Sequence, residues 1–358
     1  MCIQPGTPIT SLVRPSECSP PVSTGLSLGE ARLEVSALKV GVLGAGAMGS
    51  YVGALLALAG HQVTLVDVDV DRMRTVQRDG LTLVQPWSTR VADVRAATAP
   101  NLLEGSELVL VVTKASSLEA ALRSAVPHLG SAAKVAVLCN GLGCREVASQ
   151  WVVPDQLFYG ATAAGAVLDA AAVVRETVTG QTYLGHRQGQ RSEELLGLAE
   201  ALSEAGIATI ASDDVDSWIW TKLLINVAFN AVTSLTGALN SALVETEAGR
   251  QLVRRLVEEA VSVAAKSGVR LHCTAPVDYV MEVGAKIAAQ QSSMLQDLQR
   301  GRATEVDYIN GAVSSQAHRL GMEVPVNEAL VHLVHLREHT LGLCNAAGPP
   351  RQLGRATP

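Results

Sequence analysis

The first half of the chain alternates between short runs of apolar residues and longer segments with helical spacing. Four runs have the length and the Val/Leu-rich character of strands buried in a parallel sheet. They are residues 38–43 (LKVGVL), 61–67 (HQVTLVD), 108–113 (LVLVVT) and 134–138. The segments at 50–60 and 117–128 repeat their apolar positions every three or four residues, as helices do. The alternation predicts an α/β domain with a Rossmann-type parallel sheet.

Between residues 157 and 185 the pattern changes to short segments rich in Val, Thr and Ala. We interpret these as antiparallel strands added at an edge of the sheet. A helix at 192–205 and a strand at 207–211 follow. After Asp213 no strand is evident, and the chain predicts an all-α C-terminal domain. Its expected helices are 213–235, capped by Asp213 or Asp214, then 245–267, 278–300, 305–320 and 326–340.

These patterns divide the chain into four parts. Residues 1–36 contain scattered prolines among Ser, Thr and Gly, and predict a flexible extension. Residues 37–212 form the dinucleotide-binding domain, and residues 213–343 form a helical domain for substrate binding and dimerisation, with a homodimer through this domain as one expected assembly. Residues 344–358 form a loose tail.

Composition narrows the class of protein. Apolar residues make up 48% of the chain and charged residues 17%, which is typical of a folded protein with a large core. The formal charge of −6, without a basic face, argues against a nucleic-acid partner. Residues 40–60 lack charges, but their glycines fit a nucleotide-binding turn better than a membrane span. Six scattered cysteines show no metal-ligand spacing, so we expect no metal and a cytoplasmic location.

A glycine-rich turn follows the first predicted strand. It consists of Gly44, Ala45, Gly46, Ala47, Met48 and Gly49. In a strand–turn–helix–strand unit, the first glycine allows the tight turn and the second lets a pyrophosphate approach the backbone. The third glycine lets helix and strand pack closely. The sequence therefore predicts a dinucleotide site at this turn.

An acidic residue, Asp67, ends the second predicted strand. A carboxylate at this place binds the ribose hydroxyls of NAD and repels the 2′-phosphate of NADP. Arg72 and Arg74 follow closely, and either side chain could reach a phosphate. The cofactor is therefore NAD or NADP, with NAD favoured by Asp67.

Two polar residues stand where predicted strands end. Lys114 follows the third strand and Asn140 the fourth. Ligands of open α/β sheets bind outside the carboxyl ends of the strands, which makes both residues candidates for the site. A capping asparagine and a solvent-exposed lysine are the structural alternatives.

A polar stripe marks the long helix predicted at 213–235. Lys222, Asn226 and Asn230 are spaced i, i+4, i+8 on a helix that is otherwise almost entirely apolar. Asparagine is a poor helix former and is uncommon on solvated helix faces. We therefore interpret the stripe as donors and acceptors that face a polar ligand.

Further polar residues are found in the last third of the chain. Ser293 and Asp297 share a helix face, and Glu305 starts the next predicted helix, where an acid also complements the helix dipole. Three histidines lie on the helix at 326–340. Without a nearby carboxylate or cysteine pattern, they favour a solvated face over a metal site. They are His332, His335 and His339.

Together these motifs resemble the ketopantoate reductase (2-dehydropantoate 2-reductase) family over residues 38–340. The motifs that carry the resemblance are GAGAMG (44–49), TK (113–114), NGLG (140–143), WTKLLINVAFNAVTSLTG (220–237) and SSMLQD to TEVDYING (292–311). The resemblance implies NAD(P)H-dependent reduction of a 2-keto acid.

The resemblance also implies roles for the residues. Lys222 would be the general acid that protonates the keto oxygen, and Glu305 would orient Lys222 or the substrate. The remaining residues would bind the substrate, support the site or lie near the nicotinamide. Asn226, Asn230 and Ser293 would bind the substrate, Asp297 would support the site, and Lys114 and Asn140 would lie where nicotinamide and substrate meet.

Two departures from the family pattern leave alternatives open. Gln290 replaces the usual asparagine before the Ser-Ser pair, and Asp67-Val68-Asp69 stands where an arginine for the NADP phosphate is expected. An NAD-dependent D-2-hydroxyacid dehydrogenase similar to D-mandelate dehydrogenase is therefore the second hypothesis. A cofactor-binding sensor without turnover is the third.

Overall fold

The computed structural model describes residues 37–186 and 191–343. The extension predicted at 1–36 and the tail predicted at 344–358 lie outside the described residues.

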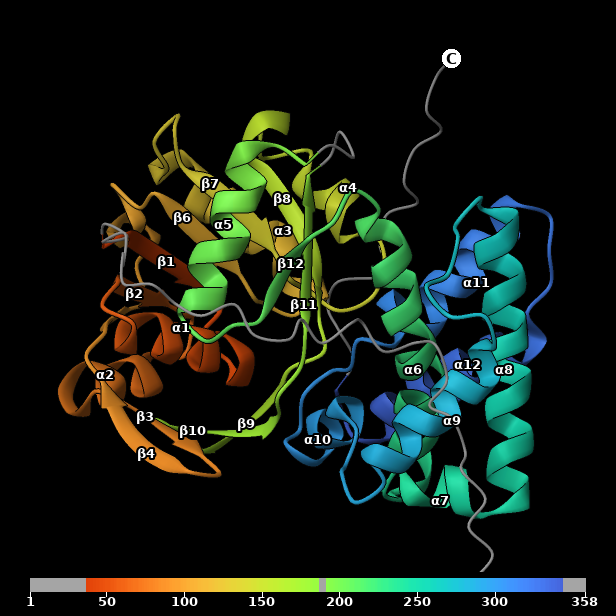
Figure 1. The fold of residues 1–358 in the computed structure, drawn as a ribbon. Coiled ribbons are helices and arrows are strands. Elements are labelled where there is room, and N and C mark those ends of the chain that lie inside the picture. Colours follow the sequence, from red (N-terminus) through yellow and green to blue (C-terminus); the bar gives the residue numbers. More distant parts are fainter. Residues whose placement is uncertain (1–36, 187–190, 344–358) are drawn as a thin grey trace, which may run out of the picture. The chain divides into compact units, whose positions relative to one another are not determined.

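An eight-stranded sheet forms the first half, in the order β12-β11-β8-β7-β6-β1-β2-β5 (Figure 1). Six neighbouring strands of this sheet run parallel; they are β8, β7, β6, β1, β2 and β5. Strand β11 pairs antiparallel with β8 and parallel with β12. The strands are β1 (Lys39–Leu43), β2 (Gln62–Val66), β5 (Arg95–Ala97), β6 (Leu108–Val111), β7 (Lys134–Val137), β8 (Leu157–Thr162), β11 (Thr182–His186) and β12 (Thr209–Ala211). The predicted Rossmann-type sheet with added antiparallel strands is confirmed.

A second, four-stranded sheet was not predicted. It has the order β4-β3-β10-β9 and consists of β3 (Leu81–Gln85), β4 (Ser88–Ala92), β9 (Gly165–Ala170) and β10 (Val173–Val178). The expectation that all segments between 157 and 185 extend the main sheet is therefore wrong for β9 and β10. Strand β10 pairs with β3 and β9 pairs with β10, and the long-range pairing of β10 with β3 leaves no local trace in the sequence.

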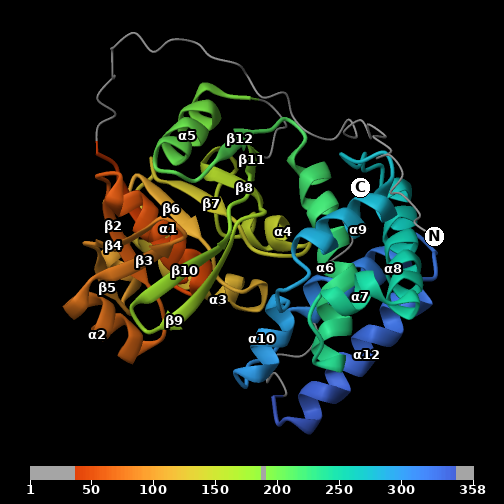
Figure 2. The same ribbon diagram turned by 60° about the horizontal axis from the view of Figure 1, so that its bottom comes forward.

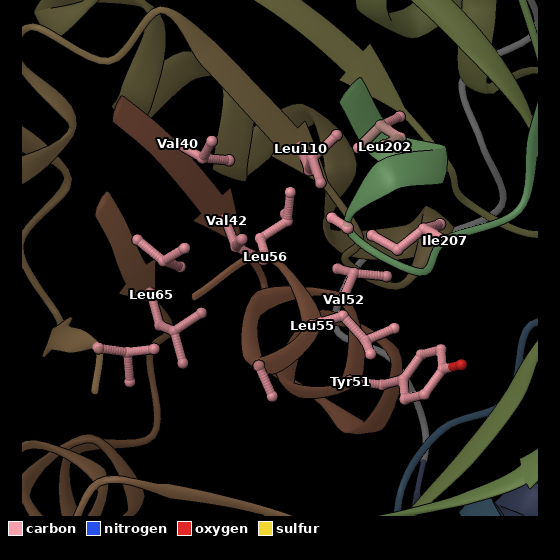
Figure 3. Packing of buried hydrophobic residues seen from close by; sticks show 14 of the residues in the cluster. Val40, Val42, Tyr51, Val52, Leu55, Leu56, Leu65, Leu110, Leu202 and Ile207 are labelled. Atoms are coloured by element: carbon pink, nitrogen blue, oxygen red, sulfur yellow. The ribbon is translucent and has the colours of Figure 1, made fainter. Parts of the chain in front are cut away.

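Helix α1 (Ala47–Leu58) packs between the two sheets, which explains why it is apolar on all sides. Figure 3 shows its side chains against strands β1, β2 and β6 and against the region of α5. The other helical elements of this half are α2 (Val70–Asp79), α3 (Leu118–Ala125), α4 (Cys144–Ala148), α5 (Glu193–Glu204) and the short 3-10 turns η1 (Pro100–Leu103), η2 (Ala115–Ser117), η3 (Val126–His128) and η4 (Pro154–Gln156).

From residue 213 to 343 the described chain is helical, as predicted (Figure 2). Its elements are α6 (Val215–Thr236), α7 (Ser241–Glu245), α8 (Glu247–Lys266), α9 (Pro276–Lys286), α10 (Ser293–Gln299), η5 (Val306–Tyr308), α11 (Asn310–Arg319) and α12 (Pro325–Thr340). Along the described residues, no helix is both long and apolar enough to cross a membrane.

Two of the predicted helices have different limits. The helix expected at 278–300 is broken into α9 and α10, because carbonyl groups between them accept hydrogen bonds from Asn240 and Ser241, and Ser292 caps α10. The helix expected to begin at Glu305 begins at Asn310, after the turn η5. Tertiary partners decide both breaks, and sequence periodicity does not record them.

Helix α6 contributes to the cores of both halves. Asp214 caps its N-terminus, as predicted, by accepting a hydrogen bond from Ser217 N. Its first turn packs against the main sheet, where the Trp218 ring stacks on Tyr183 of β11 at 3.6 Å. Its later turns lie within the helical core, with Phe229 fully buried.

Candidate active site

The glycine turn between β1 and α1 has the geometry that a dinucleotide requires. Gly44 has a φ of 91°, and a side chain there would press on the backbone of Thr113. A Cβ at Gly49 would collide with the Gly44 carbonyl oxygen. At Gly46, in contrast, a Cβ would meet no protein atom within 4 Å. Among the described residues no side chain caps α1, so its first N–H groups suit a pyrophosphate.

Asp67, at the end of β2, is bound to a buried arginine. The Arg72 guanidinium forms an ion pair of 2.8 Å with Asp67 Oδ2 and also donates to the carbonyl oxygen of Ala45 in the glycine turn. The second carboxylate oxygen of Asp67 accepts a hydrogen bond from Asp69 N. Arg72 therefore links the acidic residue to the turn and lies inward, whereas Arg74 is largely exposed.

Lys114 connects the two halves of the chain. It follows Thr113, whose backbone touches the glycine turn, so its own backbone lies beside the predicted dinucleotide site. Its Nζ forms an ion pair of 2.5 Å with Asp297 of α10 and donates to Ala303 O. Burial raises the pKa of Asp297, and the Lys114 charge opposes that rise.

Lys222, Asn140 and Glu305 form one hydrogen-bonded group. Lys222 Nζ donates to Asn140 Oδ1 at 2.7 Å, and Asn140 Nδ2 donates to Glu305 Oε2 at 3.3 Å. The other oxygen of Glu305 accepts from Ala115 N at 2.9 Å. The group thus unites α6, the loop after β7 and the segment before η5. Lys222 is not directed to bulk water.

The ionisation of this group is strongly perturbed. Burial lowers the pKa of Lys222 to about 8, although the charge of Glu305 partly opposes the change. Glu305 is only 7% exposed, and burial raises the pKa of its carboxyl. Its hydrogen bond from Ala115 and the charge of Lys114 favour the ionised form. An amine whose pKa lies near neutrality suits a proton donor.

The rest of the α6 stripe carries unused hydrogen-bonding groups. Asn230 is 5% exposed, and its buried Nδ2 has no partner among the described residues. Asn226 is half-buried, and its side chain likewise makes no hydrogen bond within the described chain. A buried amide donor without a partner is costly, so a ligand that accepts from Asn230 would satisfy it.

The two serines that precede α10 differ in their surroundings. Ser292 is buried, caps α10, and has its hydroxyl oxygen 2.6 Å from that of Thr233 on α6. Ser293 is exposed, and its hydroxyl binds no other described residue. Ser292 thus holds the local fold, while Ser293 is free to contact a ligand.

His335 is 43% exposed, in line with the predicted solvated face, but it also belongs to a polar group that the sequence pattern did not indicate. Its Nδ1 lies 3.1 Å from Glu338 Oε2 and its Nε2 lies 2.9 Å from Asp307 Oδ1. The i, i+3 spacing of His335 and Glu338 was a usable signal. Within residues 37–186 and 191–343, no group of three or more His, Cys, Asp or Glu side chains could hold a metal ion.

A separate cavity of about 320 Å³ lies between the small sheet and the α10 region. Most of its lining is polar, and none of the predicted catalytic side chains contributes to it. It is lined by Val167, Leu168, Asp169, Arg175, Thr177, Gln290, Gln291, Gln296, Gln299 and Arg300.

The parallel sheet and its glycine turn define a Rossmann-type dinucleotide-binding fold, which is followed by a helical C-terminal half. Comparison with known proteins gives the family. The models described as "Ketopantoate reductase PanE/ApbA" and "Ketopantoate reductase PanE/ApbA C terminal" match residues 40–189 and 214–338. The chain belongs to the ketopantoate reductase family.

Curated relatives match over almost their whole length. The 2-dehydropantoate 2-reductase of Halobacterium salinarum is 35% identical over 302 residues, which cover 84% of this chain and 99% of the relative. The corresponding protein of Mesorhizobium japonicum is 31% identical over 317 residues, covering 83% and 97%.

Solved structures of two activities share the fold. A PanE/ApbA family ketopantoate reductase from Ralstonia eutropha JMP134 has a TM-score of 0.79 and 28% identity, covering 85% of this chain and all of that chain. A D-mandelate dehydrogenase with NADH and anilino(oxo)acetate has a TM-score of 0.80 and 26% identity, covering 86% and 100%.

Proposed function

We propose that this protein reduces 2-dehydropantoate to pantoate with NAD(P)H, with Lys222 as general acid. The observation that supports this most is the Lys222–Asn140–Glu305 group, in which a half-buried amine of lowered pKa lies beside the carboxyl end of β7. Residues 37–212 would bind the dinucleotide and residues 213–343 the keto acid.

The residues of the glycine turn fit a dinucleotide, because the space at Gly46 is open and α1 begins there. When bound, the nicotinamide supplies the hydride that the keto carbon accepts. The Lys222 ammonium stabilises the negative charge that develops on the keto oxygen and donates the proton. Asn140 holds the amine in place, and Glu305 supplies the opposite charge that keeps it protonated.

Substrate binding would use the groups that the protein leaves free. The partnerless Nδ2 of Asn230 can donate to a carboxylate, whereas the Asn226 amide and the Ser293 hydroxyl can either donate to a carboxylate or accept from a hydroxyl. Lys114 and Asp297 form an ion pair that joins the dinucleotide half to α10, and so they would support the site.

The pH dependence of the reduction should follow Lys222. A general acid acts in its protonated form, and this amine loses its proton as the pH rises through about 8. We therefore expect kcat for keto acid reduction to be high below that pH and to fall above it. Steady-state rates between about pH 6 and pH 10 at saturating reduced cofactor measure this. A rate that stays constant to the upper limit would contradict the assignment.

A D-2-hydroxyacid dehydrogenase that uses another C3-branched 2-keto acid is the second candidate. It is favoured by Gln290 in place of asparagine, by Asp67 at the end of β2, and by the similarity to D-mandelate dehydrogenase. The deciding experiment offers the purified protein 2-dehydropantoate and phenylglyoxylate, each with NADH or NADPH, and follows the absorbance of the reduced cofactor. Cofactor binding without turnover of any keto acid would support a sensor instead.

For the cofactor we propose a preference for NAD, set by Asp67. Asp67→Ala should shift the ratio of kcat/KM values toward NADPH for two reasons. It removes a carboxylate that repels the 2′-phosphate, and it frees the Arg72 guanidinium to pair with that phosphate. Asp71→Ala is the control, because the Asp71 side chain is exposed and, among the described residues, pairs only with Arg74, at 3.7 Å. An unchanged ratio in Asp67→Ala would refute the assignment.

A further inference from the structure

The segment that carries Glu305 is hydrogen-bonded to helix α12. Thr304 N, one residue before Glu305, donates a hydrogen bond of 2.6 Å to Glu338 Oε1. Glu338 is only 5% exposed. A buried carboxylate that accepts from a backbone N–H forms a charge-assisted hydrogen bond, which is stronger than a bond between neutral groups. The backbone before Glu305 is therefore fixed to α12.

His335 extends this attachment to the other side of Glu305. One ring nitrogen faces Glu338 and the other faces Asp307, two residues after Glu305. Burial lowers the pKa of His335, but the charges and hydrogen bonds of the two carboxylates outweigh it and raise that pKa above its usual value. The imidazolium form donates from both nitrogens and binds both carboxylates.

We propose that Glu338 and His335 are positioning residues for the reaction. They act through Thr304 and Asp307, and they keep the Glu305 carboxylate against Ala115 N and Asn140. This inference rests on the proposed function, in which Lys222 is the proton donor. It assigns a role in the active site to the last described helix.

The inference has a specific electrostatic consequence. The titratable groups that face the Lys222 amine are Glu305 and Cys139, and the charge of Glu305 raises the pKa of this amine against the effect of burial. If the Glu305 segment loosens, that charge moves away and the Lys222 pKa falls further. A residue that only stabilised the fold would leave this pKa unchanged.

The test compares Glu338→Ala with Glu338→Gln. The alanine variant loses the acceptor for Thr304 N, and a small displacement of reacting groups lowers rates steeply. We expect kcat to fall by about tenfold or more, with a smaller change in KM for the keto acid. The decline of kcat at alkaline pH should move to lower pH. The glutamine variant keeps an acceptor oxygen and should recover most of the rate.

Glu328→Ala is the matched control. Glu328 lies on the same helix and pairs with His318 at 2.7 Å, but among the described residues neither side chain forms a hydrogen bond or ion pair with the 304–307 segment. Its kcat and pH profile should equal those of the parent. If Glu338→Ala does not fold, His335→Ala decides, because this side chain is 43% exposed and its loss leaves no closed cavity. A shifted profile in that variant supports the inference, and an unshifted one overturns it.

A second readout does not depend on turnover. Labelling with acetic anhydride at a series of pH values, followed by peptide mass spectrometry, measures the pKa of Lys222 directly. A lower Lys222 pKa in Glu338→Ala supports the positioning role even if the parent reduces no keto acid, in which case only the proposed function fails. A folded Glu338→Ala with parental kcat and parental Lys222 pKa overturns the inference while the proposed function stands.

Discussion

Lys222→Ala is expected to lower kcat for keto acid reduction by about two to four powers of ten, the usual range for the loss of a general acid. Two effects add in this variant. The amine that hydrogen-bonds Asn140 and would donate the proton is lost, and the buried Glu305 carboxylate loses one neighbouring positive charge, although Lys114 remains. Stopped-flow or steady-state absorbance of the reduced cofactor measures the change.

The control is another lysine that the proposed chemistry does not use. Lys134, at the start of β7, pairs with Glu194 at 2.9 Å on the surface, and Lys134→Ala should retain the parental rate. Binding of reduced cofactor, followed by its fluorescence, should be unchanged in both variants. A Lys222→Ala enzyme that keeps more than about a tenth of the parental kcat would mean that the proton comes from another donor.

Gly46→Ala is expected to weaken cofactor binding by about tenfold or more, which corresponds to roughly 1.4 kcal/mol, without lowering the melting temperature. The added methyl group meets no protein atom within 4 Å, and the backbone at Gly46, with φ −61°, is open to any residue. The methyl group instead projects into the space that the pyrophosphate would occupy. Titration of fluorescence with reduced cofactor gives Kd, and calorimetry gives the melting temperature.

Substitutions at two other glycines serve as controls for this result. Gly197→Ala, in the interior of α5, also adds a methyl group to open space and should leave cofactor affinity unchanged while slightly raising the melting temperature, because alanine favours the helix. Gly49→Ala should lower stability, because its Cβ would collide with the Gly44 carbonyl oxygen. Should Gly46→Ala bind the cofactor as tightly as the parent, the dinucleotide would not lie at this turn.

Much of the fold could be predicted from the sequence because local patterns specify it. The strands β1, β6 and β7 are short, mainly apolar runs, and Asp214 caps α6 where expected. The small sheet could not be predicted in this way. Its strands β3 and β10 lie far apart in the sequence, and their pairing depends on packing against α1.

Residues of the candidate site could be predicted where the type of residue and its position in the predicted elements both indicate a function. Asn140 and Lys222 were identified separately, and the structure brings them within 2.7 Å. The partner of Lys114 could not be predicted, because its ion pair with Asp297 crosses between the two halves. The pairing of Asp67 with Arg72 was likewise not foreseen, since an arginine on the surface of α2 could equally have pointed to solvent.

Helix α6 has a consequence for how the whole enzyme unfolds. At 22 residues it is about 33 Å long. Its first turn places Val215 in the core under the main sheet, and its later turns supply Phe229 to the helical core. Both hydrophobic cores include residues of this shared helix, so we expect heat or denaturant to unfold the two halves together. Lys222, the proposed proton donor, lies on this same helix between Val215 and Phe229.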